Sequence, residues 1–82
     1  MQTEALQTEP KEFVEAEIIL ENWPRPFVCR TAPLNDRRAL ISTSLAQDLP
    51  DWFSLALAPD FTPRSCTVTW RGQRLLKVAL FE

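Results

Sequence analysis

Histidine is absent from the sequence, and glycine occurs once, as Gly72. Without histidine the chain lacks the usual general base near neutral pH. It also lacks every catalytic pair in which a histidine activates a serine or cysteine nucleophile. A single glycine also excludes a glycine-rich phosphate-binding loop. Glu15 and Glu17 resemble an acid–base pair only superficially, because both fall on the solvated face of one predicted strand. We therefore expect that the protein is not an enzyme.

Cysteine is scarce as well, with only Cys29 and Cys66 in the chain. Both lie in strand-like runs, and cytoplasmic thiols are normally kept reduced, so we expect two buried free thiols. Without histidine or further cysteines, the sequence argues against a zinc site. No apolar run approaches the roughly 20 residues that span a membrane, and no signal-peptide pattern is present. These absences predict a cytoplasmic protein without membrane insertion.

What the sequence does contain is the alternation typical of β-strands. Its 82 residues suit one domain, and 45% of them are apolar, so a core can form. Val14, Ala16 and Ile18 alternate with Glu15 and Glu17, as in a strand with one buried face. Comparable patterns, separated by turn signals, predict six strands, at residues 14–20, 27–31, 38–43, 52–58, 65–70 and 75–81.

Six short strands favour an all-β fold, a small antiparallel β-barrel, because closure removes the exposed edges of a flat sheet. We assign residues 13–82 to this barrel. Residues 1–12 have no apolar periodicity, so we expect a flexible acidic leader there. Gly72 joins the last two strands, where we expect a tight turn with φ > 0.

Acidic and basic residues are unevenly distributed along the chain. Residues 1–21 contain six Glu and one Lys, a net charge of −5, whereas residues 22–82 contain eight basic and five acidic residues, a net charge of +3. One interpretation is a solvated acidic start and an ordinary mixed surface. The other is a basic face on the folded body that receives an anion or an acidic partner.

Three segments of the second half carry a resemblance to a known family. They are L-P-D-W-F-S-L at residues 49–55, C-T-V-T-W-R at 66–71 and L-K-V-A-L-F at 76–81. With Cys29 upstream and Ala39 and Ile41 in the strand that follows it, they resemble PilZ domains over most of residues 14–81. The resemblance implies a PilZ-like barrel and a place in bacterial cyclic di-GMP signalling, such as the regulation of motility and pili.

The family's ligand-binding motifs are substituted in this chain. PilZ domains that bind cyclic di-GMP carry R-x-x-x-R before the first strand and a [D/N]-x-S-x-x-G loop after the second. No arginine precedes Val14, where Lys11 is a poor substitute for a guanidinium fork. The second motif falls on Pro33, Asn35 and Arg38, and Arg38 fills the position that glycine leaves open for the ligand. We therefore expect no high-affinity nucleotide binding and no cofactor.

The candidate binding residues are Arg30, Asn35, Arg37, Arg38 and Trp23. The arginines and Asn35 form either a substitute phosphate clamp or a solvated basic loop. Trp23 lies among polar residues and prolines, and is either a lid over one barrel end or an aromatic side chain that binds a partner.

The other two tryptophans have different expected roles. Trp52 lies on the strand face opposite Phe53, so it is either a rim residue or an interface anchor. Trp70 alternates with Thr69 in phase with Cys66, which predicts that Trp70 belongs to the core.

These observations leave three hypotheses of function. The leading one is a non-catalytic PilZ-like adaptor that acts through protein–protein interaction, as some members of the family do. The alternative is a cyclic di-GMP receptor with a non-standard site made by Arg30, Arg37 and Arg38. The third, a barrel that stacks tryptophans on single-stranded nucleic acid, is disfavoured by the isoelectric point near 5.1. The sequence thus predicts a protein partner and no nucleic-acid polymer.

Overall fold

The computed structural model describes residues 13–81, so the predicted leader at residues 1–12 lies outside the described residues. All strand pairings are antiparallel, and residues 13–81 contain no helix. The predicted six-stranded all-β fold is therefore confirmed. The strands are β1 (Val14–Ile19), β2 (Phe27–Asn35), β3 (Arg38–Ser42), β4 (Trp52–Leu57), β5 (Thr62–Arg71) and β6 (Leu75–Phe81).

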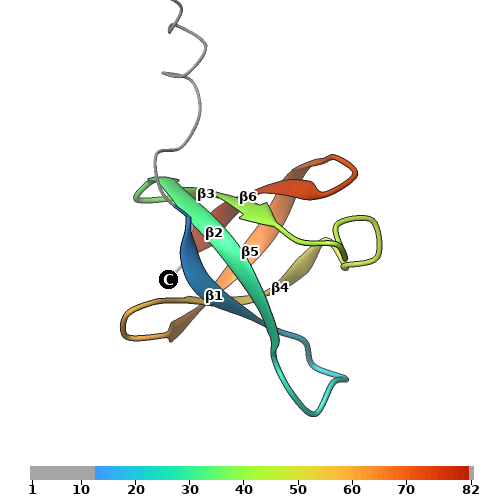
Figure 1. Cartoon of the computed structure of the whole chain (residues 1–82), viewed down its shortest axis with the longest axis horizontal. Helices are drawn as coiled ribbons and strands as arrows, with labels where there is room; N and C mark the ends of the chain where they lie inside the picture. The colour runs from blue at the N-terminus through green and yellow to red at the C-terminus, as the bar shows by residue number, and fades with distance from the viewer. Residues whose placement is uncertain (1–12, 82) are drawn as a thin grey trace, which may run out of the picture.

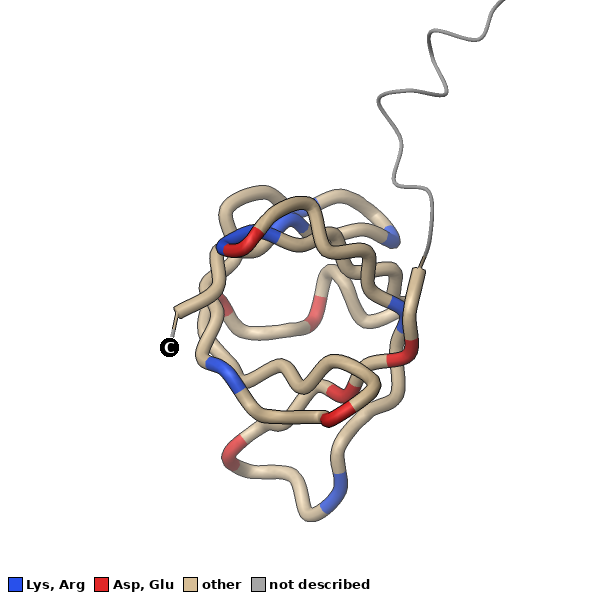
Figure 2. Tube along the Cα trace, turned by 90° about the vertical axis from the view of Figure 1, so that its left-hand side faces the viewer, with Lys and Arg blue, Asp and Glu red and all other residues tan. Residues whose placement is uncertain are grey.

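The six strands close into a barrel in the order β1-β2-β3-β6-β5-β4 (Figure 1). Seen along its length, the chain trace forms a closed ring (Figure 2). Four of the pairings join strands that follow one another in sequence, and the remaining two, β1 with β4 and β3 with β6, complete the ring. Every strand described therefore has a neighbour on both sides, and none is left as an edge.

The barrel core is made by alternate residues that point inward from every strand. Thr31 is the buried polar residue of this core, and its hydroxyl lies 3.6 Å from the Cys29 sulfur. Cys29 and Cys66 are both buried and free, as predicted. The largest fully buried side chains are Ile18, Ile41, Leu55, Leu76, Val78, Thr31 and Cys66.

The connection between β3 and β4 crosses one end of the barrel. β3 and β4 are three places apart in the six-membered ring, so residues 43–51 must pass from one side of the barrel to the other. Within this connection the Leu49 N–H donates to the Leu45 carbonyl at 3.1 Å and forms a single turn. Ala46 is 0% exposed and Leu49 5% exposed, so the crossing loop caps the core with apolar side chains.

Gly72 lies in the connection between β5 and β6 as predicted, but the predicted positive φ is wrong. Among residues 13–81 no glycine has a positive φ, and the positive value belongs to Phe61, at 52°. A Cβ on Gly72 would instead lie 2.6 Å from Cη2 of Trp70. The glycine is thus required by the close approach of an indole ring, and not by the handedness of the turn.

The prediction that Trp70 is a core residue is also wrong. The register between β5 and β6 shifts between Val68 and Trp70, where Val68 pairs with Val78 and Trp70 pairs with Lys77. The extra residue, Thr69, reverses the alternation that places Cys66 and Val68 inside. Trp70 is consequently 49% exposed, with the Lys77 ammonium 5.8 Å from its ring centroid.

Candidate functional site

The connections between the strands gather at two opposite ends of the barrel (Figure 1), and four of the five candidate residues lie at or beside them. We call the end with the connections at residues 20–26, 43–51 and 72–74 the crossing end. The terminal end carries the connections at residues 36–37 and 58–61, together with the start of β1 and the end of β6. Trp23 belongs to the crossing end, whereas Asn35, Arg37 and Arg38 belong to the terminal end. The nine residues of β2 separate them by roughly 25 Å.

At the terminal end, Asn35 shapes the turn between β2 and β3. Its side-chain oxygen accepts a hydrogen bond from the Arg37 N–H at 2.8 Å. Arg37 lines a hollow of about 400 Å³ with Asp36, Arg64 and Phe81. Arg64 donates to the Asp36 carbonyl at 3.2 Å, so a second arginine, which the sequence analysis did not select, lies beside this turn.

Arg30 does not join Arg37 and Arg38 in one cluster. Arg30 pairs with Ser42 at the far end of β3, four residues from Arg38. That offset corresponds to roughly 13 Å along the strand. On its other side Arg30 lies opposite Glu15 of β1, a residue of the opposite charge. The predicted three-arginine clamp is therefore spread along the β2–β3 ribbon.

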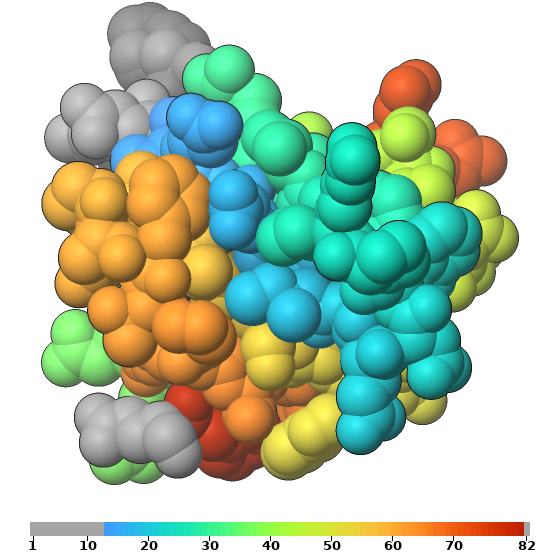
Figure 3. Space-filling model, turned by 90° about the horizontal axis from the view of Figure 1, so that it is seen from below, coloured from blue at the N-terminus to red at the C-terminus, as the bar shows by residue number. Residues whose placement is uncertain are grey.

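At the crossing end, Trp23 and Trp52 border a hollow that we call the aromatic groove. Trp23 is 56% exposed and Trp52 is 59% exposed, although both indoles are large and apolar. The hollow has a volume of about 550 Å³, within the usual range for ligand clefts. Figure 3 shows the β1–β2 connection, in cyan, projecting beside β4, in yellow. The residues that line the groove are Ile19, Leu20, Glu21, Asn22, Trp23, Asp48, Pro50, Trp52, Phe53 and Ser54.

Aromatic neighbours support both tryptophans. The Trp23 ring meets Phe27 edge to face, with centroids 5.1 Å apart. Trp52 begins β4 opposite Thr67, in the middle of β5, because the strands are staggered. From there it stacks on Phe81 of β6, with ring centroids 5.6 Å apart and an interplanar angle of 23°. Each indole is thus supported on one side while more than half of its surface is open to solvent.

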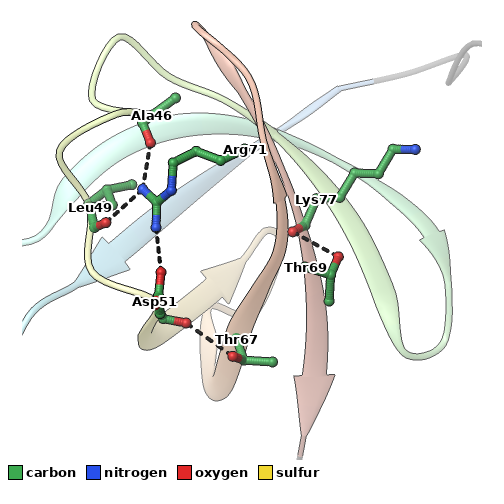
Figure 4. Close-up of polar contacts among 7 residues, drawn as sticks. All are labelled: Ala46, Leu49, Asp51, Thr67, Thr69, Arg71 and Lys77. Atoms are coloured by element: carbon green, nitrogen blue, oxygen red, sulfur yellow. Dashed lines mark hydrogen bonds and ion pairs between the residues drawn. The ribbon is translucent and has the colours of Figure 1, made fainter.

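Arg71 fixes the wall of the groove that comes from the crossing loop (Figure 4). Its guanidinium donates to the carbonyl oxygens of Ala46 and Leu49, both at 2.7 Å. It also donates to the Asp51 carboxylate at 2.7 Å. The Asp51 carbonyl in turn accepts bonds from the Thr67 hydroxyl at 3.1 Å and from the Val68 N–H at 2.9 Å. These bonds tie residues 46–51 to β5 and so position Asp48 and Pro50.

The charge of the groove has one sign. Its lining contains the carboxylates of Glu21 and Asp48 and no lysine or arginine. Arg25, in the same β1–β2 connection as Glu21, is not among the lining residues. Over the rest of the barrel acidic and basic positions are interspersed (Figure 2). The groove therefore combines flat apolar surfaces with a locally negative rim, which favours a partner that is apolar and carries positive charge.

The two thiols do not form a second chemical site. Burial raises the pKa of Cys66 to about 12, an effect that a backbone hydrogen bond at Phe53 only partly offsets. Burial also raises the pKa of Cys29, against a smaller opposite effect of the Thr31 hydroxyl. Both thiols are thus neutral near pH 7, and a neutral thiol is a poor nucleophile.

Over residues 13–81 no group of three or more acidic or cysteine side chains could hold a metal ion. In the same part of the chain, no helix has the length and apolar character needed to cross a membrane. No family model, no curated protein and no solved structure matches the chain. The resemblance to PilZ domains thus stays a prediction.

Sequence reasoning selected Trp23 but missed most of the groove. It left Trp52 undecided between a rim residue and an interface anchor, and it did not select Glu21, Asp48 or Pro50. The signal that was available is the solvent-facing phase of Trp52 in a strand whose other face is Phe53 and Leu55. The sequence does not indicate that the β1–β2 connection and the crossing loop lie next to each other. Their proximity follows from the pairing of β1 with β4.

Proposed function

We propose that this protein is a small, non-catalytic adaptor domain of the cytoplasm, a PilZ-like barrel that binds another protein through the aromatic groove. The observation that carries the proposal is the pair of tryptophans, Trp23 and Trp52, which are both more than half exposed on one hollow. Tryptophans at the centre of an interface commonly supply much of the binding free energy. The resemblance of residues 49–81 to PilZ domains supports a regulatory role.

A selection from random peptides displayed on phage, with the full chain as target, tests this proposal. Selected peptides are then titrated against the purified protein by fluorescence anisotropy. We expect Trp23→Ala and Trp52→Ala each to weaken binding about 10-fold or more, as loss of an interface hot spot does. Trp70→Ala is the matched control, because Trp70 is 49% exposed and lies outside the groove. Absence of any binder, or equal losses in all three variants, would contradict the proposal.

A cyclic di-GMP receptor is the second candidate, and the observation that favours it is the hollow shared by Arg37 and Arg64. Phe81 lines the same hollow and offers a surface on which a base could stack. Against it, Asp36 lies in the hollow, and Arg30 is held elsewhere on β2. The charge-assisted forks that this ligand needs are therefore incomplete.

Isothermal calorimetry with cyclic di-GMP distinguishes the two candidates. We expect no binding tighter than about 10 μM, which corresponds to roughly 7 kcal/mol. Saturable binding at lower concentration, abolished by Arg37→Ala and Arg64→Ala but retained by Trp23→Ala, would replace the adaptor proposal with the receptor proposal.

A further inference from the structure

We propose that the aromatic groove binds a proline-rich segment of a partner protein, in the polyproline II conformation, with a lysine or arginine next to its prolines. This inference rests on the proposed function and specifies the chemistry of the partner. Three properties of the described residues lead to it: the closed ring of strands, the apolar surfaces of the groove and its charge.

The closed ring removes one common way of binding a peptide. An extended peptide often adds a strand to an exposed sheet edge, where main-chain hydrogen bonds hold it. Each of the six strands already has two antiparallel neighbours, so residues 13–81 contain no strand that is unpaired along one whole side. The end of β2 extends beyond its pairing with β1, which stops at Thr31, but this free stretch is short. A peptide must instead be held by side chains, in a conformation that does not need ladder pairing.

Polyproline II meets that requirement, and the groove offers the surfaces that it uses. This helix has no internal hydrogen bonds and is already extended before binding, so little conformational entropy is lost when it docks. Its proline rings pack against aromatic side chains, and Trp23 and Trp52 both line the groove, together with the apolar Pro50. Its free carbonyls need donors, and the lining includes residue types that have them, Asn22 with its amide and the tryptophans with their indole N–H groups.

The charge of the groove selects among proline-rich segments. Glu21 and Asp48 give the lining two carboxylates without a basic residue, so a lysine or arginine beside the prolines has an oppositely charged neighbour. Asp51 is a third carboxylate nearby, but Arg71 already binds it at 2.7 Å. Glu21 and Asp48, which make no ion pair within residues 13–81, thus favour a basic flank and disfavour an acidic one.

The same charge argues against the two occupants that the protein itself could provide. Residues 1–12 of the chain contain three Glu and one Lys, so they have the same sign as the rim. A second copy docked groove to groove would bring Glu21 and Asp48 of both copies together. Like charges so placed repel each other, and we therefore assign the groove to a different, basic partner.

The test uses the full chain and the sequences of the peptides selected on phage. We expect the selected peptides to be enriched in proline and, on one flank, in lysine or arginine. For a synthetic peptide of the selected consensus, replacing its prolines with alanine should weaken binding about 10-fold or more. Replacing its basic residue with glutamate should weaken binding about 10-fold at low salt and less at high salt.

Charge-reversal variants of the groove test the same electrostatic interaction from the side of the protein. Glu21→Lys and Asp48→Lys together should weaken binding of the consensus peptide about 3- to 10-fold without disturbing the core, because both residues are exposed. Asp60→Lys, in the β4–β5 connection at the terminal end, makes the same kind of charge change away from the groove and should have no effect.

The outcomes separate this inference from the proposed function. Peptides that lack proline or basic residues, but still lose binding in Trp23→Ala and Trp52→Ala, would overturn the inference and leave the adaptor proposal standing. If the chain self-associates and Trp52→Ala abolishes this self-association, the groove binds a second copy, and the inference of a proline-rich partner is overturned. Binding that neither tryptophan affects would overturn both.

Discussion

Trp70 and Gly72 depend on each other. The indole of Trp70 lies over the β5–β6 turn, so close that a methyl group on Gly72 would meet its Cη2 atom at 2.6 Å. Gly72 does not have a positive φ, so its backbone conformation is open to any residue. The requirement for glycine therefore comes from one side chain, and removal of that side chain should remove the requirement.

Gly72→Ala should lower the free energy of unfolding by about 1 kcal/mol in the native sequence. The displaced ring costs more than alanine gains by restricting the unfolded chain, a gain of about 0.4–1 kcal/mol. In the Trp70→Ala background the same substitution should be neutral or stabilising by about 0.5 kcal/mol. Urea denaturation of the four proteins measures this coupling. Equal effects of Gly72→Ala in both backgrounds would show that the ring is not the cause.

The element that depends most on one side chain is the crossing loop between β3 and β4. Of the three bonds that Arg71 makes to this loop, the two to carbonyl oxygens should contribute most, because the Asp51 carboxylate of the third bond is 87% exposed. A hydrogen bond to a charged group contributes about 1.5–3 kcal/mol, whereas an exposed ion pair contributes about 1 kcal/mol at most.

Arg71→Met keeps the length of the side chain but removes its donors, and it should destabilise the protein by about 2–4 kcal/mol. Asp51→Ala removes only the exposed ion pair and should cost about 1 kcal/mol or less. Urea denaturation gives both values, and hydrogen exchange should show faster exchange in residues 43–51 of Arg71→Met. Equal costs of the two variants would show that the ion pair, and not the carbonyl bonds, holds the loop.

Individual strands could be predicted from the sequence, but their registers and long-range neighbours could not. The predicted ranges agree with all six strands, with the largest differences at the end of β2 and the start of β5. Period-2 alternation marks a buried face as long as no residue is inserted. The bulge at Thr69 breaks that condition, and nothing in T-V-T-W-R distinguishes a bulged strand from a regular one. Trp70 was for this reason placed on the wrong face.

The candidate site was harder to predict for a related reason. The separation of Trp23 from Arg37 by the length of β2 does follow from the predicted strands. The presence of Trp23 and Trp52 on one hollow does not follow from them, because it depends on the β1–β4 pairing and on the path of the crossing loop. Local patterns in a sequence do not determine which distant strands pair when a barrel closes.

At the scale of the whole molecule, stability should fall as the pH rises above about 9. Burial raises the folded-state pKa of Cys66 from 9.0 to about 12, so in this interval the unfolded thiol ionises while the folded one keeps its proton. Ionisation then stabilises the unfolded state relative to the folded one, by up to about 1.4 kcal/mol per pH unit above the pKa of the unfolded thiol. Tyrosine, which would titrate in the same interval, is absent from the sequence.

The measurement is the free energy of unfolding at pH 7 and pH 10 in the presence of a reductant. Cys66→Ala should be less stable at both values, because it leaves a cavity, but its loss between them should be smaller by up to about 1.4 kcal/mol. A variant with the same pH dependence as the native protein would show that the buried thiol does not contribute.

The order of the ring divides the barrel into two halves of similar design. β1–β2–β3 and β4–β5–β6 are each a three-stranded meander built from pairings between successive strands, and only the β1–β4 and β3–β6 seams join them. The crossing loop at residues 43–51 is the sole covalent link between the halves. Two copies that exchanged their second halves would therefore form every native pairing twice, which is the topology of a domain-swapped dimer. In this light the bonds of Arg71 to the loop also keep each chain closed on itself.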